Sequence, residues 1–463
     1  MTASRWIQRI LPARYRRNPD EGMAMMKQIH DLAWPATVES IFVSLVGMVD
    51  TVMVSTLGTT AIAAVGLCSQ PRFIAQSFTL SLNVAVTALI SRRVGQQNYS
   101  AASHCLRQAL LCSGFIAFLV CGASALFARP YLMLAGGTDQ TIDMAVSYFQ
   151  IAMIAQFFQA LSTTITTAQR SGGNSRISMQ ANVTANVVNI ILNYLWIGGH
   201  FGFEAMGVTG AALATLVGSM AGCLMALISV LRRNSALPLH PRQSWRFQRE
   251  TLRLLSRISA AAFLEQFCLR LGGFLYARLA AGLGTESLAT HQICVDTTNI
   301  LFSFFDGYVA AAAALTGRMM GASRPERAKD YVDLGCRMAL VLAVVLMVAT
   351  LLLKRPILRL FTDDLLILAQ GEQILTMCAL LLGILALRMI WAGALRGAGD
   401  TRFVALSTFF SMTLLRPLLA WLFSGPLGLG LMGIWMALAA DFLLRWLMSG
   451  WRYRSGRWMG ISF

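Results

Sequence analysis

Two carboxylates lie inside an apolar run near the start of the chain. The run extends over residues 34–60, and a helix needs only about 20 residues to cross a bilayer. Glu39 and Asp50 are 11 positions apart with no basic residue between them, which places them on nearly the same helix face. A charge at bilayer depth costs about 2.5–3.5 kcal/mol, so such residues usually have a function. Burial favours the neutral form of a carboxyl group. These residues therefore predict a carrier whose first helix binds and releases protons.

The composition indicates a polytopic α-helical membrane protein. Of the 463 residues, 56% are hydrophobic and 13% charged, whereas a soluble chain carries about 25% charged residues. The net charge of +17 lies mostly in short loops between apolar runs, which is typical of membrane topology and argues against nucleic-acid binding. Nine cysteines form no CxxC pair, and Walker and HExxH motifs are absent from the sequence. We therefore expect no metal centre, no cofactor and no enzyme activity.

The chain repeats itself at an offset of 226 residues. Glu39 falls on Glu265, the Leu57-Gly58-Thr59 turn on Leu283-Gly284-Thr285, and Arg170 on Arg396. One offset along the whole length predicts an internal duplication. Each half has six expected spans: roughly 31–57, 67–91, 105–127, 142–169, 177–198 and 207–231, then 254–282, 287–317, 331–353, 366–395, 403–424 and 433–451.

The predicted fold is all-α, with twelve transmembrane helices in two six-helix bundles. The expected parts are a cytoplasmic tail (1–30), the first bundle (31–231), a basic cytoplasmic linker (232–253), the second bundle (254–451) and a cytoplasmic tail (452–463). The loops expected outside hold only Arg129, Lys354, Arg355 and Arg359, so the positive-inside rule places both termini in the cytoplasm. Because six is even, the bundles share one orientation and a pseudo-two-fold axis along the membrane normal.

Four asparagines share one face of the fifth expected span. Asn182, Asn186, Asn189 and Asn193 are spaced by 4, 3 and 4 residues. They could be interhelical hydrogen-bonding residues, worth about 0.6 kcal/mol each. The alternative is a polar cavity wall that faces Asp50. Both interpretations fit the spacing.

The second half repeats the shape of the first with different chemistry. Tyr276 stands at the position of Asp50, and Asp296 and Asp306 lie in the eighth span. Arginines at membrane depth, including Arg270 and Arg388, could neutralise Glu265 or Asp306. Asp441 and Arg445, spaced i,i+4, predict a local ion pair. Phe302, beside Asp306, could belong to an aromatic wall or to the packed core.

Four stretches resemble the multidrug and toxic compound extrusion (MATE) family over about residues 30 to 455. They are GMVDTVMVSTLG (47–58), GNSRISMQANVTANVVNIILNYLWIGG (173–199), LGTESLATHQI (283–293) and ALRGAGDTRF (394–403). The resemblance implies export of amphiphilic, often cationic drugs against inward H+ or Na+. It also implies that Asp50 is the first-helix coupling acid and that Asn189 lies near it.

The chain fits neither main branch of that family fully. Asn193 stands where one branch has a second aspartate. Glu265 matches an acid of the branch often coupled to Na+, but Leu385 replaces that branch's tenth-helix acid. Glu39 and the Gly456-Arg457-Trp458 stretch resemble a branch that includes a flavin exporter.

The sequence thus predicts a monomeric antiporter of the inner (plasma) membrane that exports amphiphilic small molecules in exchange for H+. Asp50, Glu265 and Glu39 are the expected ion-coupling residues. The expected substrate cavity is formed by Asn189, Asn193, Asn186, Asp306, Asp296 and Tyr276. The alternatives are a Na+-coupled exporter of drugs or flavins, with Na+ at Glu265 or Asp50, and a lipid-linked oligosaccharide flippase of related fold. Carboxylate oxygens suit such a hard cation.

Overall fold

The computed structural model describes residues 19–139, 141–232, 237–239 and 245–461. All the long elements in this part of the chain are helices. Most of the predicted tail 1–30 and part of the predicted linker 232–253 lie outside the described residues, and residues 19–30 begin the first helix. The helices are α2 (Pro19–Ser55), α3 (Thr59–Gly95), α4 (Tyr99–Leu126), α5 (Ala128–Leu134), α6 (Ile142–Ser171), α7 (Ser175–Gly198), α8 (Gly207–Leu231), α9 (Arg249–Ala281), α10 (Thr285–Gly321), α11 (Pro325–Arg359), α12 (Leu365–Ala398), α13 (Thr401–Thr408), α14 (Arg416–Ser424) and α15 (Gly430–Arg454).

Among the described residues, eleven helical segments are long and apolar enough to cross a membrane. One of them, Thr401–Ser424, combines α13, the π-helix η3 (Phe409–Leu415) and α14. The polar helix α7 is long enough at 24 residues but does not qualify by hydropathy. Its four asparagines explain this. With α7, the described part of the chain contains the twelve long helices that the sequence predicts.

The helices form two compact units, which divide at Thr37/Val38 and at Phe263/Leu264. Adding the repeat offset of 226 to the first division gives the second. Each unit therefore contains the beginning of the first helix of the other half: residues 19–37 of α2 belong with the C-terminal helices, and residues 249–263 of α9 with the N-terminal ones. The units thus start and end at other residues than the predicted bundles 31–231 and 254–451.

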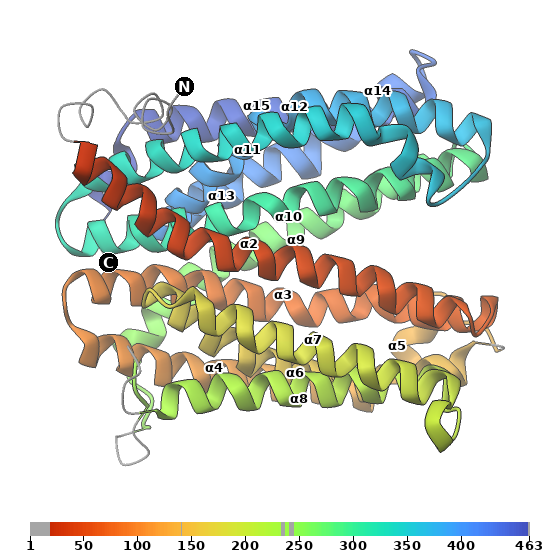
Figure 1. Cartoon of the computed structure of the whole chain (residues 1–463), viewed down its shortest axis with the longest axis horizontal. Helices are drawn as coiled ribbons and strands as arrows, with labels where there is room; N and C mark the ends of the chain where they lie inside the picture. The colour runs from red at the N-terminus through yellow and green to blue at the C-terminus, as the bar shows by residue number, and fades with distance from the viewer. Residues whose placement is uncertain (1–18, 140, 233–236, 240–244, 462–463) are drawn as a thin grey trace. The chain divides into compact units, whose positions relative to one another are not determined.

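In the N-terminal unit (38–263), α6 packs against α3, α4 and α8, and α8 packs against α7 (Figure 1). Its core includes Cys68, Phe149, Met153 and Ala212. In the C-terminal unit (19–37 and 264–463), α12 lies beside α10, α11 and α15 (Figure 1). The largest fully buried side chains of its core are Trp435 and Trp458.

The duplication is visible in the backbone of the turns. Gly58 and Gly284, at the repeated Leu-Gly-Thr turn, have φ of 100° and 107°. Gln97 and Ser323, also 226 residues apart, have φ of 58° and 57°. A positive φ is unfavourable for residues other than glycine, so its recurrence at equivalent positions supports the internal repeat.

Gly397 provides a test of how closely α12 and α10 approach. A Cβ at this position would meet the backbone of Ala313, with the carbonyl carbon at 2.7 Å. We expect Gly397→Ala to lower the stability of the protein by about 1–3 kcal/mol, because backbone cannot move aside. The thermal midpoint of the purified protein measures this. Gly335→Ala is the control, since nothing lies within 4 Å of its Cβ position. Equal midpoints for the two variants would contradict the close approach.

Candidate functional site

Asp50 lies on α2, half-buried in the N-terminal unit, opposite the asparagine face of α7. The Asn193 amide donates to Asp50 Oδ1 at 2.7 Å. With its amide nitrogen turned toward the carboxylate, Asn189 donates to the same oxygen at 3.0 Å, and its own oxygen accepts from the Thr215 hydroxyl at 3.3 Å. Asn189 and Asn193 are buried. The structure therefore brings together Asp50 and two of the predicted cavity residues.

No basic nitrogen of the described residues lies within ion-pairing distance of Asp50. The positive charge of Arg72 on α3 attracts the carboxylate of Asp50 at longer range. The Arg72 guanidinium donates to the Tyr148 hydroxyl at 3.0 Å. Sequence reasoning missed Arg72, although a single arginine in the second expected span was a signal for it. Asp50 is therefore held by neutral amide donors and can be protonated without breaking a salt bridge.

Glu39 has a different environment from Asp50, three helical turns earlier on α2. Arg170 Nη2 lies 3.0 Å from both carboxylate oxygens of Glu39. The Ser178 hydroxyl donates to it at 2.8 Å and the Asn182 amide at 2.7 Å. Glu39 is buried, and its carboxylate accepts hydrogen bonds from all three of these side chains.

Glu265 repeats this arrangement in the C-terminal unit. Arg396 donates to both of its carboxylate oxygens, from Nε at 3.2 Å and from Nη2. Glu265 is 2% exposed. Both members of the Glu39–Arg170 pair recur at the offset of 226, as Glu265 and Arg396. The duplication thus includes the complete ion pair. Glu39 and Glu265, two of the three predicted ion-coupling residues, are engaged by arginine, and Asp50 is not.

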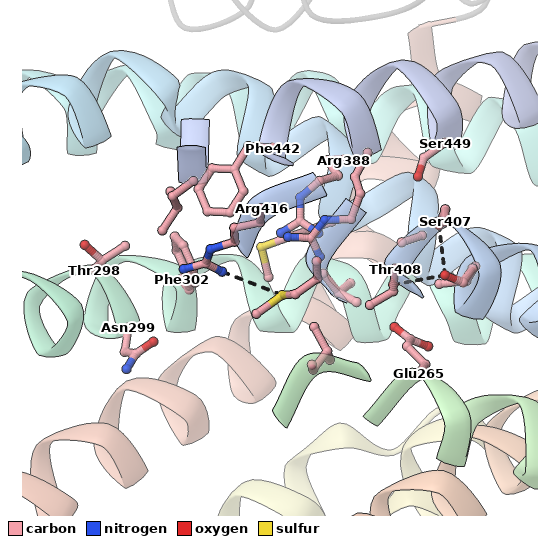
Figure 2. A pocket seen from close by; sticks show the side chains of 18 of the residues that line it. Glu265, Thr298, Asn299, Phe302, Arg388, Ser407, Thr408, Arg416, Phe442 and Ser449 are labelled. Carbon is pink, nitrogen blue, oxygen red and sulfur yellow. Dashed lines mark hydrogen bonds between the residues drawn. The ribbon is translucent and has the colours of Figure 1, made fainter. Parts of the chain in front are cut away.

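A cavity of about 400 Å³ lies within the C-terminal unit (Figure 2). Glu265 and the predicted residue Asp306 line it. Its charged lining also includes Arg388, Arg396, Arg416 and Arg445. Four arginines and two acids therefore surround this space, so its lining is predominantly basic.

The other predicted cavity residues lie elsewhere. Tyr276 is 2% exposed, and the guanidinium carbon of Arg416 lies 3.8 Å from its ring centre. Asp296 is half-buried on α10 and accepts from Gln292 at 3.0 Å. Asn186 is half-buried on α7. The predicted cavity residues are thus divided between the two units. Asn186, Asn189 and Asn193 lie in the N-terminal unit, and Tyr276, Asp296 and Asp306 lie in the C-terminal unit.

The structure assigns the arginines that the sequence left open. Arg445 pairs with Asp441, so the predicted i,i+4 pair is confirmed. Glu265 pairs with Arg396, a residue that sequence reasoning had placed in a loop, and not with Arg270 or Arg388. In the described part of the chain, no three His, Cys, Asp or Glu side chains are placed to hold a metal ion.

Comparison with known proteins gives consistent results along the chain. The MatE family model matches residues 35–195 and 261–422. The uncharacterized transporter YisQ of Bacillus subtilis is 26% identical over 93% of this chain and 94% of its own length. The probable multidrug resistance protein NorM of Thermotoga maritima is 25% identical over 95% of this chain and 94% of its own length.

Two solved structures show the same fold at 20% sequence identity. A variant of the Vibrio cholerae MATE transporter VcmN has a TM-score of 0.86, covering 94% of this chain and 99% of that one. A MOP superfamily transporter from Pyrococcus furiosus, described as having a binding pocket of reverse polarity, has a TM-score of 0.87, covering 93% and 95%. At this identity the likeness concerns the fold alone.

Proposed function

Because this chain belongs to the MatE family of multi-pass membrane transporters, we propose that it is a secondary antiporter exporting amphiphilic organic compounds in exchange for H+. The multidrug resistance proteins among its relatives support an export function. The observation that carries the proposal is the environment of Asp50: its carboxylate, on a helix long enough to cross the membrane, is held by amides, and no arginine of the described residues forms an ion pair with it.

Protonation of Asp50 would change its contacts with α7. The ionised carboxylate accepts hydrogen bonds from Asn193 and, in the orientation described above, from Asn189. A neutral carboxyl group accepts more weakly and must itself donate one hydrogen bond. Proton uptake therefore loosens the two amides, and the amide nitrogen of Asn189 can turn from Asp50 to the Thr215 hydroxyl. In our proposal this rearrangement shifts α2 against α7 and releases the substrate.

The membrane potential and the proton gradient would drive this cycle. Each positive charge that crosses the membrane is worth about 2.3 kcal/mol per 100 mV. The basic loops support a plasma-membrane orientation with both termini in the cytoplasm. We further propose that the transporter acts as a monomer.

A gradient experiment in reconstituted vesicles tests the coupling ion. We expect vesicles with an acidic interior to accumulate permanently charged amphiphilic dyes in Na+-free buffer. One pH unit provides about 1.4 kcal/mol per proton, which corresponds to roughly tenfold accumulation for one-for-one exchange. Vesicles without protein correct for dye leakage. An outward Na+ gradient at equal pH should produce no accumulation.

The opposite result would identify Na+ as the coupling ion. Accumulation driven by Na+ alone would reject proton coupling and would favour a cation site at Glu265 or Asp50. The ion pair between Glu265 and Arg396 argues against a site at Glu265, since both carboxylate oxygens already accept from the guanidinium.

A further inference from the structure

The arginine-lined cavity of the C-terminal unit contains more positive charge than its acids neutralise. Arg396 pairs with Glu265, and the negative charge of Asp306 also attracts it. Arg445 pairs with Asp441, which is completely buried beside the cavity. These two pairs account for two of the four lining arginines.

Arg388 and Arg416 have no carboxylate within ion-pairing distance among the described residues. Arg416 is only 7% exposed, and its Nε has no hydrogen-bond partner. Nη1 of Arg416 lies 3.6 Å from the Met412 sulfur, the guanidinium covers the Tyr276 ring, and the carboxylate of Asp441, which pairs with Arg445, attracts the guanidinium at longer range. The Nε of Arg388 is likewise buried without a hydrogen-bond partner.

Two unpaired guanidinium groups at membrane depth are expensive. Burial of an ion without a partner costs several kcal/mol, and ionisable residues inside membranes are therefore functional candidates. Arg416 also follows directly on the π-helix η3, which ends at Leu415. Such π-helical turns occur frequently at functional sites. We interpret the two guanidinium groups as a site that can bind an anion.

The rest of the lining suits an aromatic molecule. Phe302 and Phe442 contribute aromatic surface, and the guanidinium carbon of Arg388 lies 5.3 Å from the centre of the Phe442 ring. Thr298, Asn299, Ser407, Thr408 and Ser449 contribute hydrogen-bonding groups. In Figure 2, Glu265 lies apart from Arg416 and Phe442. A volume of about 400 Å³ is in the range of small-molecule sites.

We propose that this cavity binds the phosphate or carboxylate group of an aromatic organic molecule, with Arg388 and Arg416 as the anion-binding residues and Phe302 and Phe442 beside the ring. A planar guanidinium binds such oxyanions in a bidentate manner. The site would select anionic molecules, in contrast to the cations that the family resemblance implies. That the bound molecule is also transported rests on the proposed function.

Binding of matched naphthalene probes tests the site. The protein is placed in phosphatidylcholine nanodiscs and dialysed against 1-naphthyl phosphate, 1-naphthylmethanol or 1-naphthylmethylammonium. We expect the phosphate to bind at least roughly tenfold more tightly than the other two, as is usual for a charge-assisted hydrogen bond. Equal binding of all three probes, or a preference for the ammonium compound, would overturn the proposal.

Variants assign the effect to the two arginines. Arg388→Met and Arg416→Met keep most of the side-chain volume, and each should weaken 1-naphthyl phosphate binding by roughly tenfold or more while leaving 1-naphthylmethanol binding unchanged. The control is Arg359→Met, at the exposed end of α11. Unchanged alcohol binding also shows that a variant is folded. If phosphate binding survives in both cavity variants, the anion is bound elsewhere.

Two further measurements identify the source of the anion and separate the two proposals. If a small fraction of phosphatidylglycerol in the nanodiscs abolishes probe binding, the cavity is a lipid-headgroup site and our proposal fails. If phosphatidylglycerol has no effect, a free aromatic anion is the ligand. The Asp50→Asn variant should bind 1-naphthyl phosphate normally but not transport dyes. Binding without any proton-driven transport by the unaltered protein would reject the proposed function and retain this site.

Discussion

Asp50→Asn should abolish proton-driven dye accumulation and leave the amount of folded protein unchanged. Asparagine has the same shape as aspartate and can still hydrogen-bond to Asn193, which lies 2.7 Å from Asp50 Oδ1. It cannot exchange a proton, so the contact between α2 and α7 would stay in the state that corresponds to a neutral carboxyl group. We expect transport to fall to the level of protein-free vesicles, measured in vesicles with an acidic interior.

A control and a second measurement define this result. Asp143→Asn removes an acid that lies at the exposed start of α6, 3.1 Å from Arg129, and should transport normally. Exchange of labelled for unlabelled substrate without any gradient should also be weakened in Asp50→Asn, because the neutral side chain holds the contact between α2 and α7 in the state that releases the substrate. Proton-driven accumulation at the unaltered rate in Asp50→Asn would remove Asp50 from the coupling mechanism.

The sequence predicted the helices and the repeat better than it predicted charge pairing. Apolar runs determine helices locally, and the offset of 226 recurs in the unit divisions, in the turn at Gly58 and Gly284, and in two ion pairs. The local pair Asp441–Arg445 was also predictable, because i,i+4 spacing in a helix fixes the contact.

The long-range pairs were not predicted, for a physical reason. Which arginine meets Glu265 depends on how α9 and α12 are rotated about their axes, and apolar composition does not determine that rotation. The predicted spans end just before Arg170 and Arg396 and so place both residues in loops. In the structure they lie in the last turns of α6 and α12. One signal was available: Glu39 and Arg170 recur together as Glu265 and Arg396. A duplicated acid and a duplicated base predict a duplicated salt bridge.

The Glu39–Arg170 pair leads to a prediction about stability that separates it from Asp50. Glu39→Gln leaves the Arg170 guanidinium facing an amide, with the Ser178 and Asn182 donors partly unsatisfied. Breaking a buried pair by removing one partner costs about 3–5 kcal/mol. Because Arg170 is 24% exposed, we expect a loss of about 3 kcal/mol, at the lower end of that range. The thermal midpoint of the purified variant measures it.

The double variant Glu39→Gln/Arg170→Gln shows whether the pair stabilises the fold without taking part in proton coupling. It removes both charges and leaves two amides that can hydrogen-bond, so most of the lost stability should return. The protein that remains folded should still accumulate dye with an acidic interior, since Asp50 and its amide partners are untouched. Glu265→Gln, paired with Glu265→Gln/Arg396→Gln, should show the same loss and recovery of stability in the other repeat. If Glu39→Gln instead stops proton-driven transport at unchanged thermal stability, Glu39 takes part in coupling, and the distinction between paired and unpaired acids on α2 is wrong.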